Sequence, residues 1–234
     1  MLKIAWEYPT HKVEAKPTEG TVARSIRHAL TEAEAFRYVA GNDPRPLLVL
    51  RECKTCNGTD DALLSKGADN ERTALMSKWF HCVKLPVDVL QADHPFYEMF
   101  GHGDVEHLFV ALPDGSSKVK LQSDTSRTEL WAAMGAVLNA SYKKDPQPIV
   151  KQVRKTFDRL DVLDTRLMEL KMKRDDVIES DGTRSSKLDK VDGEIAGVTK
   201  EINALKAEIA VVSKIELKNP EGPKNVPGPA KADR

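Results

Sequence analysis

The sequence is poor in cysteine, and the number is odd: three cysteines in 234 residues. An odd number argues against the framework of disulfide bonds that holds many small secreted domains together. The N-terminal segment also lacks the apolar stretch that a secretory signal needs, and two prolines interrupt it. We therefore expect a soluble cytoplasmic protein, in a compartment that keeps cysteines as thiols at rest.

An excess of one charge and long hydrophobic runs are missing as well. Lysine and arginine together number 36, as do aspartate and glutamate, so the whole chain has no net attraction for nucleic acid or anionic lipid. No apolar run approaches the roughly 18 residues that a membrane-spanning helix needs. We expect no nucleic-acid partner and no membrane partner. The length suggests one domain of moderate size with an appendage, or two small domains.

The composition changes near residue 145. All three cysteines and all six histidines precede this point, together with most of the aromatic residues. Beyond it, apolar residues recur in alternating steps of three and four, which predicts a coiled coil. The first run contains Leu160, Leu163, Leu167, Leu170, Arg174 and Val177, and the second contains Leu188, Val191, Ile195, Val198, Ile202, Leu205, Ile209 and Val212.

A polar break at residues 180–186 separates two arms of similar length, 148–179 and 186–216. Asp181-Gly182 is a turn signal, so an antiparallel hairpin is favoured over one long helix that dimerises in parallel. The last residues are rich in proline and lack hydrophobic periodicity, which indicates disorder. The predicted organisation is a globular domain over 1–145, a helical hairpin over 146–218 and a disordered tail over 219–234.

The pattern of the first 145 residues alternates between helices and strands. It predicts a mixed sheet flanked by helices, an α/β domain that precedes the all-α antiparallel coiled-coil hairpin. Asp114-Gly115, between the last two predicted strands, indicates a β-hairpin. A capping box opens the last helix. The expected segments are a helix over 22–40, strands over 47–51 and 80–85, a helical stretch over 59–79, hairpin strands over 106–112 and 117–122, and a helix over 126–142.

Cys53 and Cys56 form a Cys-x-x-Cys pair immediately after the first predicted strand. This spacing is typical of a redox pair and also of one half of a zinc site. A metal site would need further ligands. The first candidates are His102 and His107, and the others are His81, Cys82 and His94. No second Cys-x-x-Cys, haem-attachment pattern or four-cysteine set is present. We therefore expect no bound cofactor, and Cys82 is expected to be a buried, inert thiol.

Two stretches, "RPLLVLRECKTC" and "HLFVALPDGSSKVKLQ", give residues 20–142 a resemblance to thioredoxin-fold proteins. In that family a buried strand delivers a Cys-x-x-Cys pair to the start of a helix, and a later strand hairpin precedes the last helix. The resemblance implies that Cys53 is the attacking nucleophile and Cys56 the resolving thiol. It also implies that the positive end of the helix dipole favours the Cys53 thiolate.

The chain departs from the family pattern around its cysteines. Glu52 adjoins Cys53, and a neighbouring carboxylate disfavours a thiolate. Asn57-Gly58 follows the pair, which weakens the first turn of a helix there. The family usually has a proline before its third strand, and this position falls on Glu106 or His107 here.

The sequence leaves two functions open. The first is a thioredoxin-like thiol–disulfide oxidoreductase that acts through Cys53 and Cys56 on a partner engaged by the coiled coil. The second is a non-catalytic thioredoxin-fold module for protein interaction or oligomerisation, whose cysteines are structural or bind metal. In either case the coiled coil is expected to contact a protein partner or a second copy of the chain, which would make a homodimer.

Overall fold

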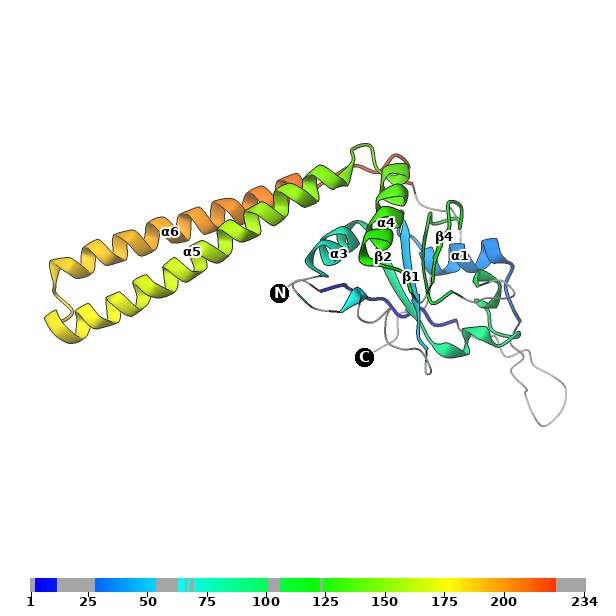
Figure 1. The fold of residues 1–234 in the computed structure, drawn as a ribbon, viewed down its shortest axis with the longest axis horizontal. Coiled ribbons are helices and arrows are strands. Elements are labelled where there is room, and N and C mark those ends of the chain that lie inside the picture. Colours follow the sequence, from blue (N-terminus) through cyan, green and yellow to red (C-terminus); the bar gives the residue numbers. More distant parts are fainter. Residues whose placement is uncertain are drawn as a thin grey trace. The chain divides into compact units, whose positions relative to one another are not determined.

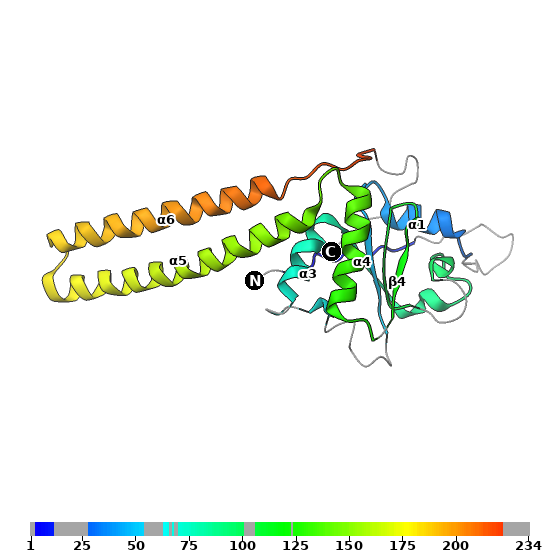
Figure 2. The same cartoon turned by 45° about the horizontal axis from the view of Figure 1, so that its top comes forward.

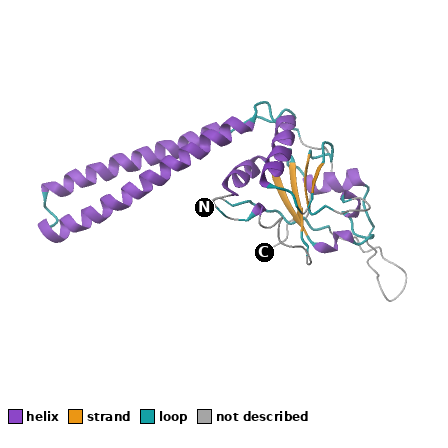
Figure 3. Ribbon diagram, in the orientation of Figure 1, coloured by secondary structure: helices purple, strands orange, loops and turns teal. Residues whose placement is uncertain are grey.

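A computed structural model of the chain describes residues 3–11, 28–53, 63–65, 67, 70–100, 106–122 and 124–221. The chain divides into two units, one formed by residues 1–146 with 216–234 and the other by residues 147–215 (Figure 1). Strands occur in the first unit, whereas the second consists of two long helices (Figure 3). Within the described ranges, no helix combines the length and the apolar character needed to cross a lipid bilayer.

The first unit is built on a mixed four-stranded sheet with the order β2-β1-β3-β4. The central strand β1 (Leu47–Arg51) pairs in parallel with β2 (His81–Leu85) and antiparallel with β3 (Leu108–Ala111). β4 (Val119–Leu121) returns antiparallel to β3 and completes the predicted hairpin. Every residue of β1 is buried, so its apolar run "LLVL" is explained by cover on both faces.

One face of the sheet is covered by α1 (Glu32–Ala40) and by the short helical turns η3 (Val87–Leu90) and η4 (Tyr97–Met99). Aromatic rings dominate this core, and Phe109 of β3 contacts both Phe36 and Phe100 edge-on. The buried sheet residues on this face are Leu47, Val49, Val83, Leu85, Phe109 and Ala111.

The opposite face is covered by α3 (Glu71–Met76), which continues into η2 (Ser77–Trp79), and by α4 (Arg127–Ser141). Figures 1 and 2 show α3 and α4 on the other side of the sheet from α1. Trp131 of α4 donates its indole N–H to the Thr73 hydroxyl of α3 at 2.9 Å, which ties the two helices together. The predicted α/β class, a mixed sheet flanked by helices, is confirmed.

The helix expected over residues 22–40 is shorter than predicted within the described chain. α1 begins at Glu32, because the Thr31 side chain accepts from the Glu34 N–H and the Glu34 carboxylate accepts from the Thr31 N–H. Residues 28–30 are not helical, although Leu30 packs against the core. The predicted start missed this capping box, whereas the one at Ser126 and Glu129 was found and opens α4.

The second unit is the predicted antiparallel hairpin, formed by α5 (Pro146–Asp181) and α6 (Ser186–Val212). Leu160 and Leu163 of α5 and Ile202 of α6 form a buried cluster in its shared seam. Gly182 adopts φ of +81°, a left-handed conformation that ends α5, and Ser185 caps α6. The expected second arm, 186–216, is longer than the observed helix, which ends at Val212.

A ladder of cross-helix contacts fixes the register of the hairpin. Each step of seven residues forward along α5 is matched by seven residues backward along α6. These side chains are exposed or nearly so, so each contact adds little stability and the set acts mainly on alignment. The contacts are Gln152 to Glu208 at 3.0 Å, Arg159 to Glu201 at 2.8 Å and Arg166 to Glu194 at 3.3 Å.

The chain after α6 returns to the segment that follows α4. Tyr142 and Leu217 form an antiparallel β-bridge. Lys143 pairs with Glu216 at 2.8 Å through their side chains, and the Lys218 ammonium donates to a backbone carbonyl of α4 at 2.7 Å. The segments that precede and follow the hairpin are thus held to each other within the first unit.

Gly115 in the β3–β4 turn offers a direct test of this packing. Its φ is +85°, and an added Cβ would lie 2.6 Å from the Phe36 ring. We expect Gly115→Ala to lower the free energy of unfolding by about 2–3 kcal/mol through backbone strain and the clash in the core. Urea unfolding would measure the change. Gly193→Ala, on open surface in α6, is the control and should not destabilise the chain; equal stability of the two variants would contradict the expectation.

Candidate functional site

The candidate site lies where the parallel strands β1 and β2 end. In α/β sheets, ligands and reactive groups gather beyond the carboxyl ends of such strands. Arg51 is the last residue of β1, and Glu52 and Cys53 follow it directly. Cys53 is half-buried, two residues beyond the strand. Cys56 and His102, the other residues predicted for the site, lie outside the described residues.

Arg51 is a buried cation beside the start of β3, with 5% of its surface exposed. Its guanidinium lies 3.2 Å from Nδ1 of His107 and donates to the Glu106 carbonyl at 3.4 Å. The backbone N–H of Arg51 donates to the His107 carbonyl at 2.7 Å, so the β1–β3 pairing extends to this point. The same guanidinium nitrogen lies 3.3 Å from Nε2 of His107, and because a guanidinium can only donate, His107 is the acceptor in this contact. The structure thus places His107 next to the strand end that leads to Cys53.

Glu106 is a fully buried carboxylate two residues before the start of β3. Lys118 pairs with its Oε1 at 2.5 Å, and Lys120 pairs with its Oε2 at 3.3 Å. Lys118 also donates to the Met99 carbonyl and lies 4.5 Å above the Phe109 ring. The two lysines therefore neutralise the carboxylate and tie β4 to the segment that enters β3.

Sequence reasoning did not single out Glu106 or Lys118 as a pair. A signal for them exists: a glutamate precedes the fully apolar strand β3, and lysines alternate in "SKVKLQ", which places both on one side of β4. Their pairing depends on the β3–β4 register, in which Phe109 lies opposite Lys120. Spacing alone could not identify the partner of each charge.

Glu52, which the sequence marks as unfavourable for a thiolate at Cys53, has a cationic partner. Lys84 of β2 lies 3.2 Å from its carboxylate. The Glu52 side chain is 47% exposed, so solvent screens this pair and its stabilising effect is small. The pair nevertheless offsets the negative charge beside Cys53, and Arg51 adds a buried positive charge nearby.

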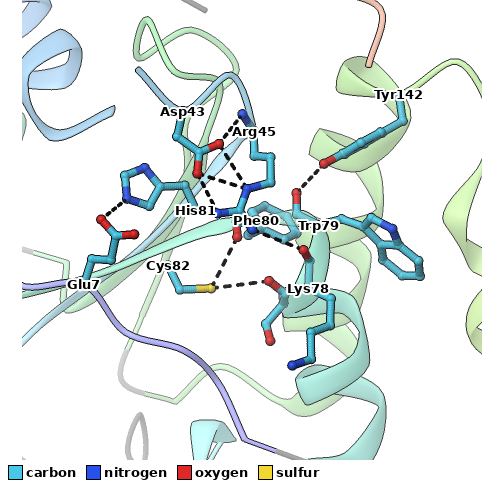
Figure 4. Close-up of polar contacts among 10 residues, drawn as sticks. Glu7, Asp43, Arg45, Lys78, Trp79, Phe80, His81, Cys82 and Tyr142 are labelled. Atoms are coloured by element: carbon cyan, nitrogen blue, oxygen red, sulfur yellow. Dashed lines mark hydrogen bonds and ion pairs between the residues drawn. The ribbon is translucent and has the colours of Figure 1, made fainter. Parts of the chain in front are cut away.

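The amino ends of the same two strands carry a second polar cluster (Figure 4). The Arg45 guanidinium donates to both carboxylate oxygens of Asp43 and to the Lys78 carbonyl at 3.3 Å. Burial alone would raise the pKa of Asp43, but the hydrogen bonds and charge of Arg45 hold it below its ordinary value. His81 of β2 lies 3.1 Å from Glu7, whose backbone bridges to β2. This cluster links four segments of the chain.

Cys82 belongs to the amino-end cluster (Figure 4) and is 3% exposed. It is free and buried, and its thiol donates to the Ser77 carbonyl at 3.5 Å. Burial raises its pKa to about 12, which keeps it a protonated thiol at neutral pH. Tyr142 donates to the Trp79 carbonyl at 2.8 Å, and burial also raises the pKa of Tyr142. Cys82 and Tyr142 thus have structural roles, and Cys82 is the buried thiol that the sequence predicted.

Within the described part of the chain, no three histidine, cysteine, aspartate or glutamate side chains gather in the geometry of a metal site. His107 faces Arg51, His81 faces Glu7, and His94 accepts from the Phe96 N–H at 3.1 Å. The alternative metal set of Cys53, Cys56, His102 and His107 includes two residues outside the described ranges, so it stays a prediction.

No known protein family, no curated protein and no solved structure matches this chain. The mixed sheet with helices on both faces, followed by two long paired helices, is established by the structure itself. Function must therefore be argued from the residues at the strand ends.

The two ends of the sheet should differ in thiol reactivity. We expect Cys82 to resist alkylation at pH 8 until denaturant is added, because it is 3% exposed and its pKa is about 12. Mass spectrometry of peptides would locate the label. Rapid labelling of Cys82 in the folded protein would contradict its placement.

The same pKa shift has a consequence for stability in alkali. The folded pKa of Cys82 lies above its ordinary value of 9.0, so between pH 9 and 12 the thiol ionises in the unfolded chain before it does in the folded one. The free energy of unfolding is therefore unaffected below pH 9 and falls as the pH rises toward 12. The loss amounts to at most about 1.4 kcal/mol per pH unit. Cys82→Ala should show a shallower decline than the wild-type chain in urea unfolding from pH 8 to 10.5. An identical decline would contradict this.

Removing one partner of the Glu106–Lys118 pair should be costly. Glu106→Gln leaves Lys118 without its carboxylate in a nearly closed site, and we expect a loss of about 3 kcal/mol in the free energy of unfolding. The double variant Glu106→Gln, Lys118→Met removes both charges and should recover much of that loss. Urea unfolding of the three proteins would measure the coupling; additive effects would contradict a direct pair.

Proposed function

We propose that this chain is a thioredoxin-like thiol–disulfide redox protein that acts through Cys53 and Cys56. Its partner is a protein engaged by the helical hairpin. The observation that carries the proposal is the position of Cys53, directly beyond the buried central strand β1. In the family that the chain resembles, a buried strand precedes the cysteine pair and a later strand hairpin precedes the last helix. Along this chain β1, the β3–β4 hairpin and α4 follow the same order.

The proposed reaction moves two electrons to a partner disulfide. The Cys53 thiolate attacks one sulfur of the disulfide, which breaks the S–S bond and expels the other sulfur as a thiolate. The Cys56 thiolate then attacks Cys53 in the mixed disulfide and releases the second partner sulfur. The partner gains two electrons and ends as a dithiol, and the chain ends with a Cys53–Cys56 disulfide.

The charges around Cys53 support the nucleophilic role. Arg51 is a buried cation two residues away in sequence, and Lys84 offsets Glu52. Positive charge near a thiol favours its thiolate form, which is the reactive species. His107, held against Arg51, is a candidate proton donor to a leaving thiolate.

The start of β3 supports a specialised reaction. The family usually has a proline at the position that falls on Glu106 or His107 here, and Glu106 instead carries a buried carboxylate paired with Lys118 and Lys120. A buried ion pair there offers a partner chain a different surface from that of a general reductant. We therefore propose a narrow range of partner disulfides.

The redox proposal is tested by turnover. The reduced wild-type chain, supplied with dithiothreitol, should accelerate the reduction of insulin disulfides, and Cys53→Ser should abolish the acceleration. Cys56→Ser should instead accumulate a mixed disulfide at Cys53, visible by intact-mass spectrometry. Cys82→Ala is the matched control and should retain the activity. A wild-type chain that does not accelerate reduction, or an active Cys53→Ser variant, would contradict the proposal.

A second candidate is a non-catalytic interaction module whose cysteines are structural or bind metal. The absence of the family's usual proline, at the position of Glu106 or His107, favours it, because that proline lies where a substrate strand would pair. Stoichiometric zinc in protein purified without reductant or chelator, together with no disulfide reduction, would support this function over the first.

A further inference from the structure

The two sides of the hairpin seam differ in the contacts that the charged residues of α5 make. On one side, the ladder of Gln152, Arg159 and Arg166 makes contacts to α6 every seven residues. On the other side of α5, a second series has the same spacing. We call this series the open stripe; it consists of Phe157, Asp164, Lys171 and Ile178.

Each residue of the open stripe leaves at least part of its side chain exposed. Phe157 packs against the hairpin's own seam, and Ile178 is half-buried, so each leaves only part of a large apolar side chain exposed. Asp164 and Lys171 are exposed, and neither forms an ion pair within the described part of the chain, in contrast to Arg159 and Arg166. Met168, which borders the stripe, is 63% exposed. Charged groups and partly exposed apolar groups thus alternate along this side of α5.

The order of these residues is self-complementary. The stripe has its midpoint between residues 167 and 168, with Asp164 and Lys171 equally far on either side of it. Phe157 and Ile178 are also equidistant from that midpoint. An antiparallel second copy of α5, related by a two-fold axis through the midpoint, therefore brings Asp164 opposite Lys171 and Phe157 opposite Ile178. Symmetry makes each of these contacts twice.

We propose that a second copy of this chain docks antiparallel on the open stripe of α5 and forms a two-fold symmetric dimer. The equivalent stripe of α6 is a poorer surface, because its Asp192 is already bound to Arg174 at 2.7 Å. This inference does not depend on the cysteines and goes beyond the redox proposal. It identifies one occupant of the hairpin surface and the contacts that select it.

The acidic residues beside the stripe limit the affinity. Asp161 and Asp175 are exposed and lie within one residue of facing each other in the antiparallel arrangement, so the dimer contains like charges as well as complementary ones. Four large apolar side chains and two charge pairs make a small contact. We expect association at roughly micromolar concentrations.

Charge reversal tests the proposal in the full chain. Sedimentation velocity over a range of concentrations should show a monomer–dimer equilibrium for the wild type. Asp164→Lys and Lys171→Asp should each weaken dimerisation by roughly tenfold or more, and the double variant should restore it. Asp158→Lys makes the same charge change on the outer face of α5 and should have little effect. Circular dichroism would verify that each variant retains its helices.

A cross-linking experiment tests the position of the axis independently. In a Cys53→Ser, Cys56→Ser background, Met168→Cys lies next to the two-fold axis, whereas the two copies of Met172→Cys would lie about 13.5 Å apart along the helices. The two methionines are almost equally exposed, at 63% and 61%. A short bismaleimide should cross-link the first variant and not the second. A wild type that stays monomeric, a double variant that is not rescued, or equal cross-linking of both variants would overturn the proposal.

Discussion

The burial of β1 is the constraint on which the first unit depends. This strand is paired on both edges and covered on both faces, so polar chemistry can occur only beyond its two ends. The amino end is closed by Asp43 and Arg45, whose hydrogen bonds join the start of β1 to the helical segment before β2. The carboxyl end leads to Cys53. The two ends thus differ: the amino end holds a closed structural cluster, and the carboxyl end holds charges close to the half-buried Cys53.

The second unit depends on a different balance. Two helices alone bury one stripe of each, and most of the seam residues outside its centre remain half-buried. The ladder side sets the alignment of α5 and α6, while the segments before and after the hairpin are joined near Tyr142 and Leu217. A hairpin of this kind keeps a fixed register and still presents unused surface, which is the basis for proposing that a second copy binds it.

The fold could be predicted from the sequence because its signals are local. The Asp-Gly turn, the box at Ser126 and the heptad steps each depend on residues a few positions apart. The features that were missed depend on pairing between distant segments. Arg51 meets His107 across the sheet, Glu106 meets Lys118 through the strand register, and Glu216 returns to Lys143 after the whole hairpin. The start of α1 is an exception, since the Thr31 box was a local signal that was overlooked.

The central claim is that Cys53 is an activated thiol at the end of β1. The most direct test is the rate at which iodoacetamide alkylates Cys53 in the reduced, folded chain at pH 6.5, where an ordinary thiol is only about 1% thiolate. The account predicts a rate well above that of glutathione and a clear decrease in Arg51→Met, which removes the buried cation. A rate equal to or below that of glutathione would contradict it.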